Sequence, residues 1–181
     1  MNIIQKIEEA RREVSRKEFE ITWELDNIDF GCLNNAPHIF FKPPFKNKYK
    51  TALQPFRIEY HRICHICPNP ELAIFTDNLN VPFNLLSEDL IFYLNENLTC
   101  MLRLMEFVKS GKRVIPPICS REYLLVNGQW VINTNIKSVS GLNIPDGAHR
   151  LCLTYWKGLN YIPVIVFDVL YDMYSMARDA E

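Results

Sequence analysis

The segment from residue 142 to residue 167 constrains the fold more than any other part of the sequence. A short β-rich run leads into Asp146-Gly147, a dipeptide that is typical of turns. Apolar residues at helical spacing follow, Gly158 is placed to end that helix, and Ile162–Phe167 suits a buried strand. These signals predict a strand, a tight turn, a helix and a second strand within one short stretch.

Two amphipathic segments predict the main helices. In residues 3–19, apolar side chains recur at spacings of three and four, and the other face carries Glu and Arg. Residues 88–109 show a longer stripe of the same kind, with Ser87 as a suitable N-cap and Gly111 placed to end the helix. The residues predicted to face the core are Ile3, Ile7, Ala10 and Val14 in the first helix, and Ile91, Leu94, Leu98, Met101, Leu102, Met105 and Val108 in the second.

Turn signals and β-rich composition predict the remaining strands. Asn127-Gly128 separates Tyr123–Val126 from Gln129–Ile136, and Asn-Gly between two β-rich runs is the strongest short-range signal for a hairpin. Two further strands are predicted, one at residues 57–66 and a short one at residues 72–75. We therefore expect a small sheet built from segments that are widely separated in the sequence.

The turn at Asp146-Gly147 lies at the N-terminus of a predicted helix, where the backbone N–H groups are free and the helix dipole is positive. Such an end binds anions readily, and Gly147 allows a ligand to approach the backbone closely. The guanidinium of Arg150 suits a phosphate or carboxylate, and His149 adds a donor. Asp146 is placed to bind a metal or to take a proton from a hydroxyl. A helix cap in an ordinary turn explains the same spacing.

The turn and its surroundings resemble the ParB/sulfiredoxin superfamily. The resemblance lies in Asp146-Gly147-Ala148-His149-Arg150-Leu151, followed by Gly158 and then Ile162-Pro163-Val164. Gly111–Ile118 resembles the segment by which that family approaches its central strand, so the similarity covers roughly residues 85–168. It implies an α+β fold with a small mixed sheet flanked by helices.

The resemblance also implies a domain division and a ligand. Residues 61–181 would form the ParB/sulfiredoxin-like domain, and residues 1–60 a helical and irregular extension packed on it, with proline-rich chain at 30–56. A last short helix is predicted at 169–178. The implied ligand is a nucleotide (ATP, ADP or CTP) with Mg²⁺, or another phosphorylated small molecule. Its phosphates would lie on Gly147, Ala148, His149 and Arg150.

Members of this family differ in chemistry. Sulfiredoxins carry a catalytic cysteine at the position of Ala148, so sulfiredoxin activity is not expected here. The family's free serine kinases use an acid at the position of Asp146, where it would act as base or bind Mg²⁺, together with a Glu from a more N-terminal element. Glu88 and Glu106 are candidates for that Glu, and the predicted catalytic set is Asp146, His149 and Glu88.

Three functions follow as hypotheses. The first is a nucleotide- or phosphate-binding domain that catalyses phosphoryl transfer or NTP hydrolysis. The second is a nuclease or DNA-processing accessory protein, which requires a basic surface from Lys137, Lys157 and residues 42–50. The third is a non-catalytic interaction protein on the same fold, which predicts that Arg150 is buried in an internal salt bridge.

Composition narrows these alternatives. The net charge is −1 and the pI is about 6.4, which argues against non-specific binding to duplex DNA. The sequence lacks an apolar run of the roughly 20 residues that would span a bilayer, and its start does not resemble a signal peptide. A cytoplasmic protein with free thiols is expected. Cys100 and Cys152 lie on apolar stripes and are predicted to be buried.

A cluster of metal-ligating residue types lies near the predicted strand at 57–66. His61, Cys64, His65 and Cys67 fall within seven residues, but structural zinc usually takes two separated pairs of ligands. If the strand continues to residue 66, alternation places His61 and His65 on one face and Cys64 on the other. We therefore interpret the cluster as part of a half-buried strand.

Overall fold

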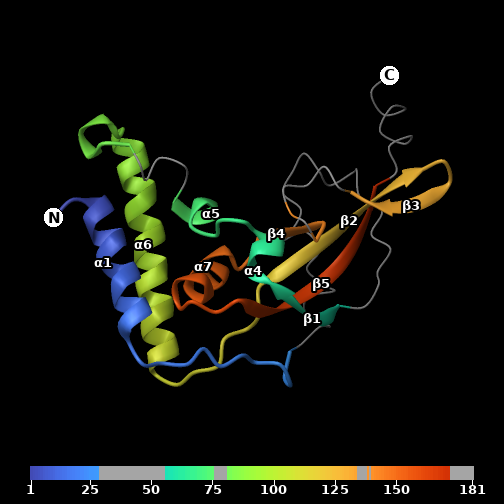
Figure 1. The fold of residues 1–181 in the computed structure, drawn as a ribbon, viewed down its shortest axis with the longest axis horizontal. Helices are drawn as coiled ribbons and strands as arrows, with labels where there is room; N and C mark the ends of the chain where they lie inside the picture. The colour runs from blue at the N-terminus through green and yellow to red at the C-terminus, as the bar shows by residue number, and fades with distance from the viewer. Residues whose placement is uncertain (29–55, 76–80, 134–137, 139, 172–181) are drawn as a thin grey trace.

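Two helices lie side by side at one end of the molecule, and a mixed sheet forms the other end (Figure 1). The computed structural model describes residues 1–28, 56–75, 81–133, 138 and 140–171. The helices are α1 (Ile3–Arg16), α4 (Ile63–Ile66), α5 (Leu72–Phe75), α6 (Glu88–Lys109) and α7 (Ala148–Trp156), with a 3₁₀ turn at Phe83–Leu85. The strands are β1 (Arg57–Arg62), β2 (Ile118–Val126), β3 (Gln129–Ile132), β4 (Leu142–Asp146) and β5 (Tyr161–Tyr171). The predicted α+β class is confirmed.

Both predicted amphipathic helices form. In α1, Asn2 and Gln5 make a reciprocal capping box, and the four apolar residues predicted to face the core are buried. In α6, Ser87 accepts a hydrogen bond from the Leu90 N–H at 3.3 Å, as an N-cap does. The core-facing stripe of α6 is narrower than predicted: Leu102 is 38% exposed, and Cys100 is exposed, so its predicted burial is wrong.

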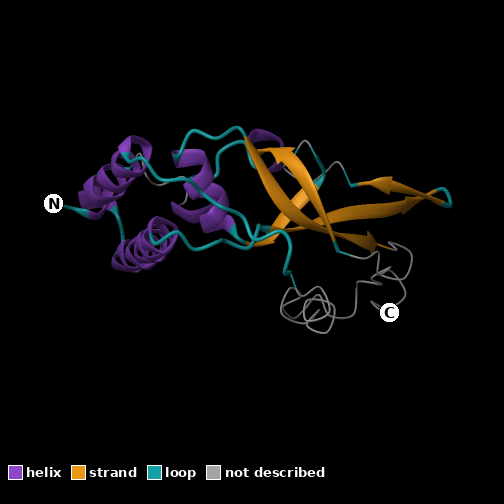
Figure 2. Ribbon diagram, turned by 90° about the horizontal axis from the view of Figure 1, so that it is seen from below, coloured by secondary structure: helices purple, strands orange, loops and turns teal. Residues whose placement is uncertain are grey.

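The sheet has the strand order β1-β5-β2-β3, and β4 pairs with β2 beside β3. Among the strands of the described residues, β2 and β5 run parallel, and the other pairs are antiparallel. Asn127 (φ +51°) and Gly128 (φ +78°) form the predicted hairpin turn between β2 and β3, which projects from the body of the protein (Figure 2). The mixed sheet is therefore assembled around β2, which contacts three strands.

Three local predictions need correction. The strand predicted at 57–66 ends at Arg62, and the one-turn helix α4 follows. Residues 72–75 are helical rather than extended. The helix predicted at residues 169–178 is wrong for residues 169–171. These residues belong to β5, which pairs in parallel with β2 as far as Tyr171. The rest of that predicted helix lies outside the described residues.

The core has two parts that meet at α7. One part lies among the helices and includes Trp156 of α7, whose ring stacks on Phe75 of α5 at 5.7 Å between centroids. The other lies between the sheet and the helices α4 and α7, and Leu151 is the α7 residue within it. Because opposite faces of α7 are buried in different cores, the N-terminus of α7 has a fixed position relative to the sheet. The predicted domain boundary after residue 60 falls inside β1.

No helix in the described part of the chain has the length and apolar character needed to cross a membrane.

Candidate functional site

The predicted turn joins β4 to α7. β4 ends at Asp146, Gly147 is the N-cap with φ +97°, and α7 begins at Ala148. Glycine adopts this left-handed conformation without the steric cost that a side chain brings. A Cβ at Gly147 would lie 2.7 Å from the Cα of Pro117, which leaves no space for one. Glycine is therefore required here both by the backbone angle and by the close approach of the Pro117 backbone.

The N-terminus of α7 carries free hydrogen-bond donors. No side chain caps it, and the first intrahelical hydrogen bond runs from the Leu151 N–H to the Gly147 carbonyl at 3.0 Å. The backbone N–H groups of Ala148, His149 and Arg150 have no partner among the described residues. Aligned N–H groups at the positive end of a helix dipole attract anions.

Arg150 anchors the turn to the segment before β2. Its Nη1 donates to the carbonyl oxygens of Ile115 at 2.7 Å and Pro116 at 3.1 Å, and its Nη2 donates to Asp146 Oδ2 at 2.5 Å. The Arg150 side chain is only 17% exposed. The guanidinium therefore keeps two hydrogen-bond donors for a ligand, the N–H of Nε and one N–H of Nη2. This internal ion pair is the feature expected of a non-catalytic interaction protein.

His149 points from α7 to α6. Its Nε2 lies 2.9 Å from Oδ1 of Asn97, in the middle of α6. Burial and the nearby charge of Arg150 lower the pKa of His149, and the carboxylate of Asp146 opposes them. The imidazole is therefore neutral near pH 7.

A cavity of about 510 Å³ opens beside the first residue of α7. We call it the β4 cavity, because β4 forms one wall and the chain around α4 and α5 forms the other. Its volume lies within the range of small-molecule sites in proteins. The lining residues that matter here are Cys67, Asn69, Ser138, Leu142, Asn143 and Ala148. Three of these six bring an amide or hydroxyl group, and none of the described residues that line the cavity is charged.

The structure brings Asp146, Gly147, Ala148, His149 and Arg150 together at one turn. Neither of the two predicted glutamates of α6, Glu88 and Glu106, lies at the level of this turn. The predicted partner Glu88 and the alternative Glu106 each lie nine residues from Asn97, the contact of His149. At 1.5 Å per residue, that separation is about 13 Å along the helix.

A charged network on the sheet was not anticipated from the sequence. Glu59 on β1 accepts hydrogen bonds from Arg121 on β2 at 2.6 and 3.1 Å and from Arg57 Nε at 2.7 Å, and its Oε2 lies 2.7 Å from His61 Nε2. Arg57 also donates to both carboxylate oxygens of Asp168 on β5. Burial alone would raise the pKa of Glu59, but these hydrogen bonds outweigh it and lower the pKa to about 2.

One feature of the sequence does point to this network. Arg57, Glu59 and His61 alternate along β1, which places three polar residues on one face of the strand. Tyr60, an apolar position of the predicted strand, is 64% exposed instead. The charged face of β1 is instead covered by its partners Arg121 on β2 and Asp168 on β5. Because these partners are distant in sequence, the sequence does not show that this face is covered.

The predicted group of histidines and cysteines does not converge. His61 contacts Glu59, Cys64 is exposed, and Cys67 packs against the core beneath the sheet. Within the described ranges, no three His, Cys, Asp or Glu side chains are placed to hold a metal ion. Cys32 and His38, which are also of metal-binding residue types, lie outside those ranges.

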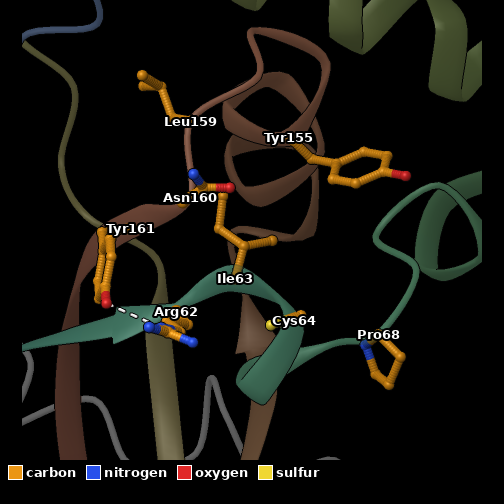
Figure 3. Close-up of a pocket in the computed structure, with 8 residues that line it drawn as sticks. All are labelled: Arg62, Ile63, Cys64, Pro68, Tyr155, Leu159, Asn160 and Tyr161. Atoms are coloured by element: carbon orange, nitrogen blue, oxygen red, sulfur yellow. Dashed lines mark hydrogen bonds between the residues drawn. The ribbon is translucent and has the colours of Figure 1, made fainter.

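A second cavity, of about 360 Å³, lies at the opposite end of α7 from the turn (Figure 3). Arg62 and Tyr161 form one side of it, where Arg62 Nε donates to the Tyr161 hydroxyl at 2.8 Å. Tyr155 and Cys64 also line it. Neither His149 nor Arg150 lines this cavity or the β4 cavity.

Comparisons with protein families, with curated proteins and with solved structures found no significant match. The turn and the cavity beside it are therefore the features that bear on function.

Proposed function

We propose that this protein binds a phosphorylated small molecule, with the phosphate at the N-terminus of α7 and the rest of the ligand in the β4 cavity. The observation that carries the proposal is the position of Ala148. Its N–H is one of the free donors of α7, and the residue also lines a cavity of about 510 Å³. The substituent of a phosphate at the helix end would therefore have this open cavity beside it.

The β4 cavity suits an uncharged and partly apolar substituent. Asn69, Ser138 and Asn143 offer hydrogen-bonding groups, and Leu142 offers an apolar wall. A nucleotide has this combination of a phosphate and a neutral polar ring system. The resemblance of the turn to the ParB/sulfiredoxin superfamily supports the same ligand class.

Asp146 and His149 are the residues of this turn whose side chains can accept a proton or bind a metal. Asp146 Oδ2 is held by Arg150, and no described residue contacts its Oδ1. Mg²⁺ commonly binds to proteins through one or two carboxylates and completes its shell with phosphate oxygens and water. A nucleotide with Mg²⁺ therefore fits this turn, and phosphoryl transfer or hydrolysis is the reaction class we propose.

The test is a thermal-shift and calorimetric titration of ATP, ADP, CTP and GTP with Mg²⁺. A ligand present at 100 times its dissociation constant stabilises the fold by about 2.7 kcal/mol. Ala148→Asp places a negative charge at the first helical position, where it favours the helix but repels a phosphate. Ala148→Asn has nearly the same shape without the charge. We expect wild type and Ala148→Asn to respond, and Ala148→Asp to lose the response while staying folded.

Arg150→Ala is a second variant for the same titration. Because Arg150 fixes the turn from inside, its loss should weaken ligand binding and stability together. Failure of all four nucleotides to stabilise wild type would contradict the nucleotide proposal.

A non-catalytic interaction protein is the second candidate, and the internal contacts of Arg150 favour it. It predicts no response to any nucleotide, so the same titration separates the two. The nuclease alternative receives less support. Lys157 lies over the ring of Phe19 and donates to the Lys17 carbonyl, and Lys137 and residues 42–50 lie outside the described residues.

A further inference from the structure

The contact between α6 and α7 defines the hydrogen-bonding state of His149. Asn97 makes two side-chain contacts: its Oδ1 lies 2.9 Å from His149 Nε2, and its Nδ2 lies 2.9 Å from the carbonyl oxygen of Tyr93, one turn earlier in α6. The second contact determines which way the Asn97 amide is turned. A carbonyl oxygen only accepts hydrogen bonds, so the amide atom facing Tyr93 is the NH₂ group.

The orientation of the amide then sets the tautomer of His149. With its NH₂ group on Tyr93, Asn97 presents its oxygen to the imidazole. An amide oxygen also only accepts, so Nε2 of His149 must carry the hydrogen. In the neutral ring the other nitrogen, Nδ1, then has a lone pair and no hydrogen.

The second ring nitrogen, Nδ1, has no partner within the described structure. In the described part of the chain, no buried side-chain nitrogen or oxygen lacks a partner, so an unpartnered Nδ1 must be accessible to solvent. The lowered pKa of His149 keeps the ring neutral at physiological pH, so Nδ1 acts as an acceptor.

We infer that Asn97 is a positioning residue that holds His149 in the Nε2–H tautomer, and that His149 contacts a hydrogen-bond donor of the ligand, a hydroxyl group or a water, rather than a phosphate oxygen. The ligand part of this inference rests on the proposed function. It names the ligand class more narrowly, as a phosphorylated molecule with a hydroxyl group close to the phosphate. It also changes the role of His149 from the predicted donor to an acceptor.

The tautomer can be tested without any ligand, by ¹⁵N NMR of the imidazole rings. Wild type is expected to show His149 protonated at Nε2 and unprotonated at Nδ1. Asn97→Ala should shift the ring towards a mixture of tautomers, whereas Asn97→Asp retains an acceptor and should preserve the Nε2–H form. Asn95→Ala is the matched control, because Asn95 makes the same kind of bond to the Ile91 carbonyl without contacting His149.

An Nδ1–H tautomer in wild type would overturn the inference, as would an Asn97→Ala spectrum identical to that of wild type. Because the chain also contains His38, His61 and His65, the His149 signal is assigned with His149→Phe.

The ligand class is tested with glycerol 3-phosphate and propyl phosphate as probes, which differ in hydroxyl groups. One neutral hydrogen bond corresponds to about three- to tenfold in affinity, so we expect glycerol 3-phosphate to bind more tightly by that factor. His149→Phe should remove the difference. Equal affinities in wild type, or a difference that persists in His149→Phe, would overturn the ligand part. If neither probe nor any nucleotide binds, the proposed function is wrong. The tautomer of His149 is decided separately, by the NMR spectra.

Discussion

Gly147 packs against the backbone of Pro117 so closely that a Cβ on Gly147 would lie 2.7 Å from the Pro117 Cα. Gly147→Ala combines this overlap with a left-handed backbone angle. The angle costs about 1–2 kcal/mol for a residue with a side chain, and overpacking typically adds 1–3 kcal/mol. We therefore expect urea unfolding to show a loss of about 2–5 kcal/mol.

Gly158→Ala is the control for this prediction. Gly158 has a similar angle, φ +76°, but a Cβ there meets no atom within 4 Å. It should cost only the conformational part, about 1–2 kcal/mol. Equal losses in the two variants would mean that the contact with Pro117 relaxes without cost.

The ion pair between Arg150 and Asp146 should matter less to stability than the contacts of Arg150 with the backbone. Asp146 is 53% exposed, and exposed ion pairs contribute about 0–1 kcal/mol. Asp146→Asn should therefore change the free energy of unfolding by less than about 1 kcal/mol. Arg150→Ala also removes the donors for the carbonyls of Ile115 and Pro116, so a larger loss, about 1–3 kcal/mol, is expected from chemical denaturation. Similar losses of stability in Asp146→Asn and Arg150→Ala would contradict this. They would mean that water satisfies the two carbonyls as well as Arg150 does.

The thiols should differ widely in reactivity. Cys64 and Cys100 are exposed, whereas Cys119 and Cys152 are 0% exposed. Burial raises the pKa of Cys119 to about 12 and also raises that of Cys152, which suppresses their reactive thiolate forms. Brief alkylation followed by peptide mass mapping should modify Cys64 and Cys100 in the folded protein, and the buried pair only after unfolding. Early modification of Cys152 would contradict the packing of α7.

Cys67 connects this experiment to the proposed function. It lines the β4 cavity, and burial raises its pKa. We expect it to react more slowly than Cys64, and more slowly still when a ligand fills the cavity. A ligand that stabilises the protein without slowing Cys67 would bind elsewhere.

The elements that were predicted well are those whose signals are local. α6 begins and ends where its cap residues indicated, and the Asn127-Gly128 hairpin formed as expected. The turn at Gly147 was also predicted, because a left-handed glycine before an amphipathic helix is specified within a few residues. In each case the residues that determine the element are neighbours in the sequence.

Predictions failed where distant contacts decide the structure. Ile74 and Phe75 resemble a short strand, but they are buried in a helical turn among the helices. Asn97 gave no sign of its role, because its contact with His149 depends on how α6 crosses α7. For the same reason the sequence could not choose between Glu88 and Glu106 as the partner of Asp146, because only the packing of α6 shows which of its residues meets the turn.

Glu59 should contribute strongly to the pH dependence of folding, because Arg57 and Arg121 donate to its carboxylate and His61 contacts it. Its folded-state pKa of about 2 lies below its ordinary value of 4.5. The unfolded state therefore binds a proton more readily between these pH values, and stability falls as the pH falls through this range. The shift corresponds to about 3 kcal/mol, which is present above about pH 4.5 and lost by about pH 2.

Glu59→Gln tests this. It leaves Arg57 and Arg121 without their shared carboxylate, and breaking a partly buried pair of this kind costs about 3–5 kcal/mol when the interior is dry. The Glu59 side chain is 23% exposed, so we expect the lower end of that range at pH 7. Urea unfolding between pH 7 and pH 2.5 should give a flatter curve for Glu59→Gln than for wild type. Glu106→Gln, at a side chain 67% exposed, should follow wild type. Parallel curves for Glu59→Gln and wild type would mean that the network does not hold Glu59 ionised in the folded state.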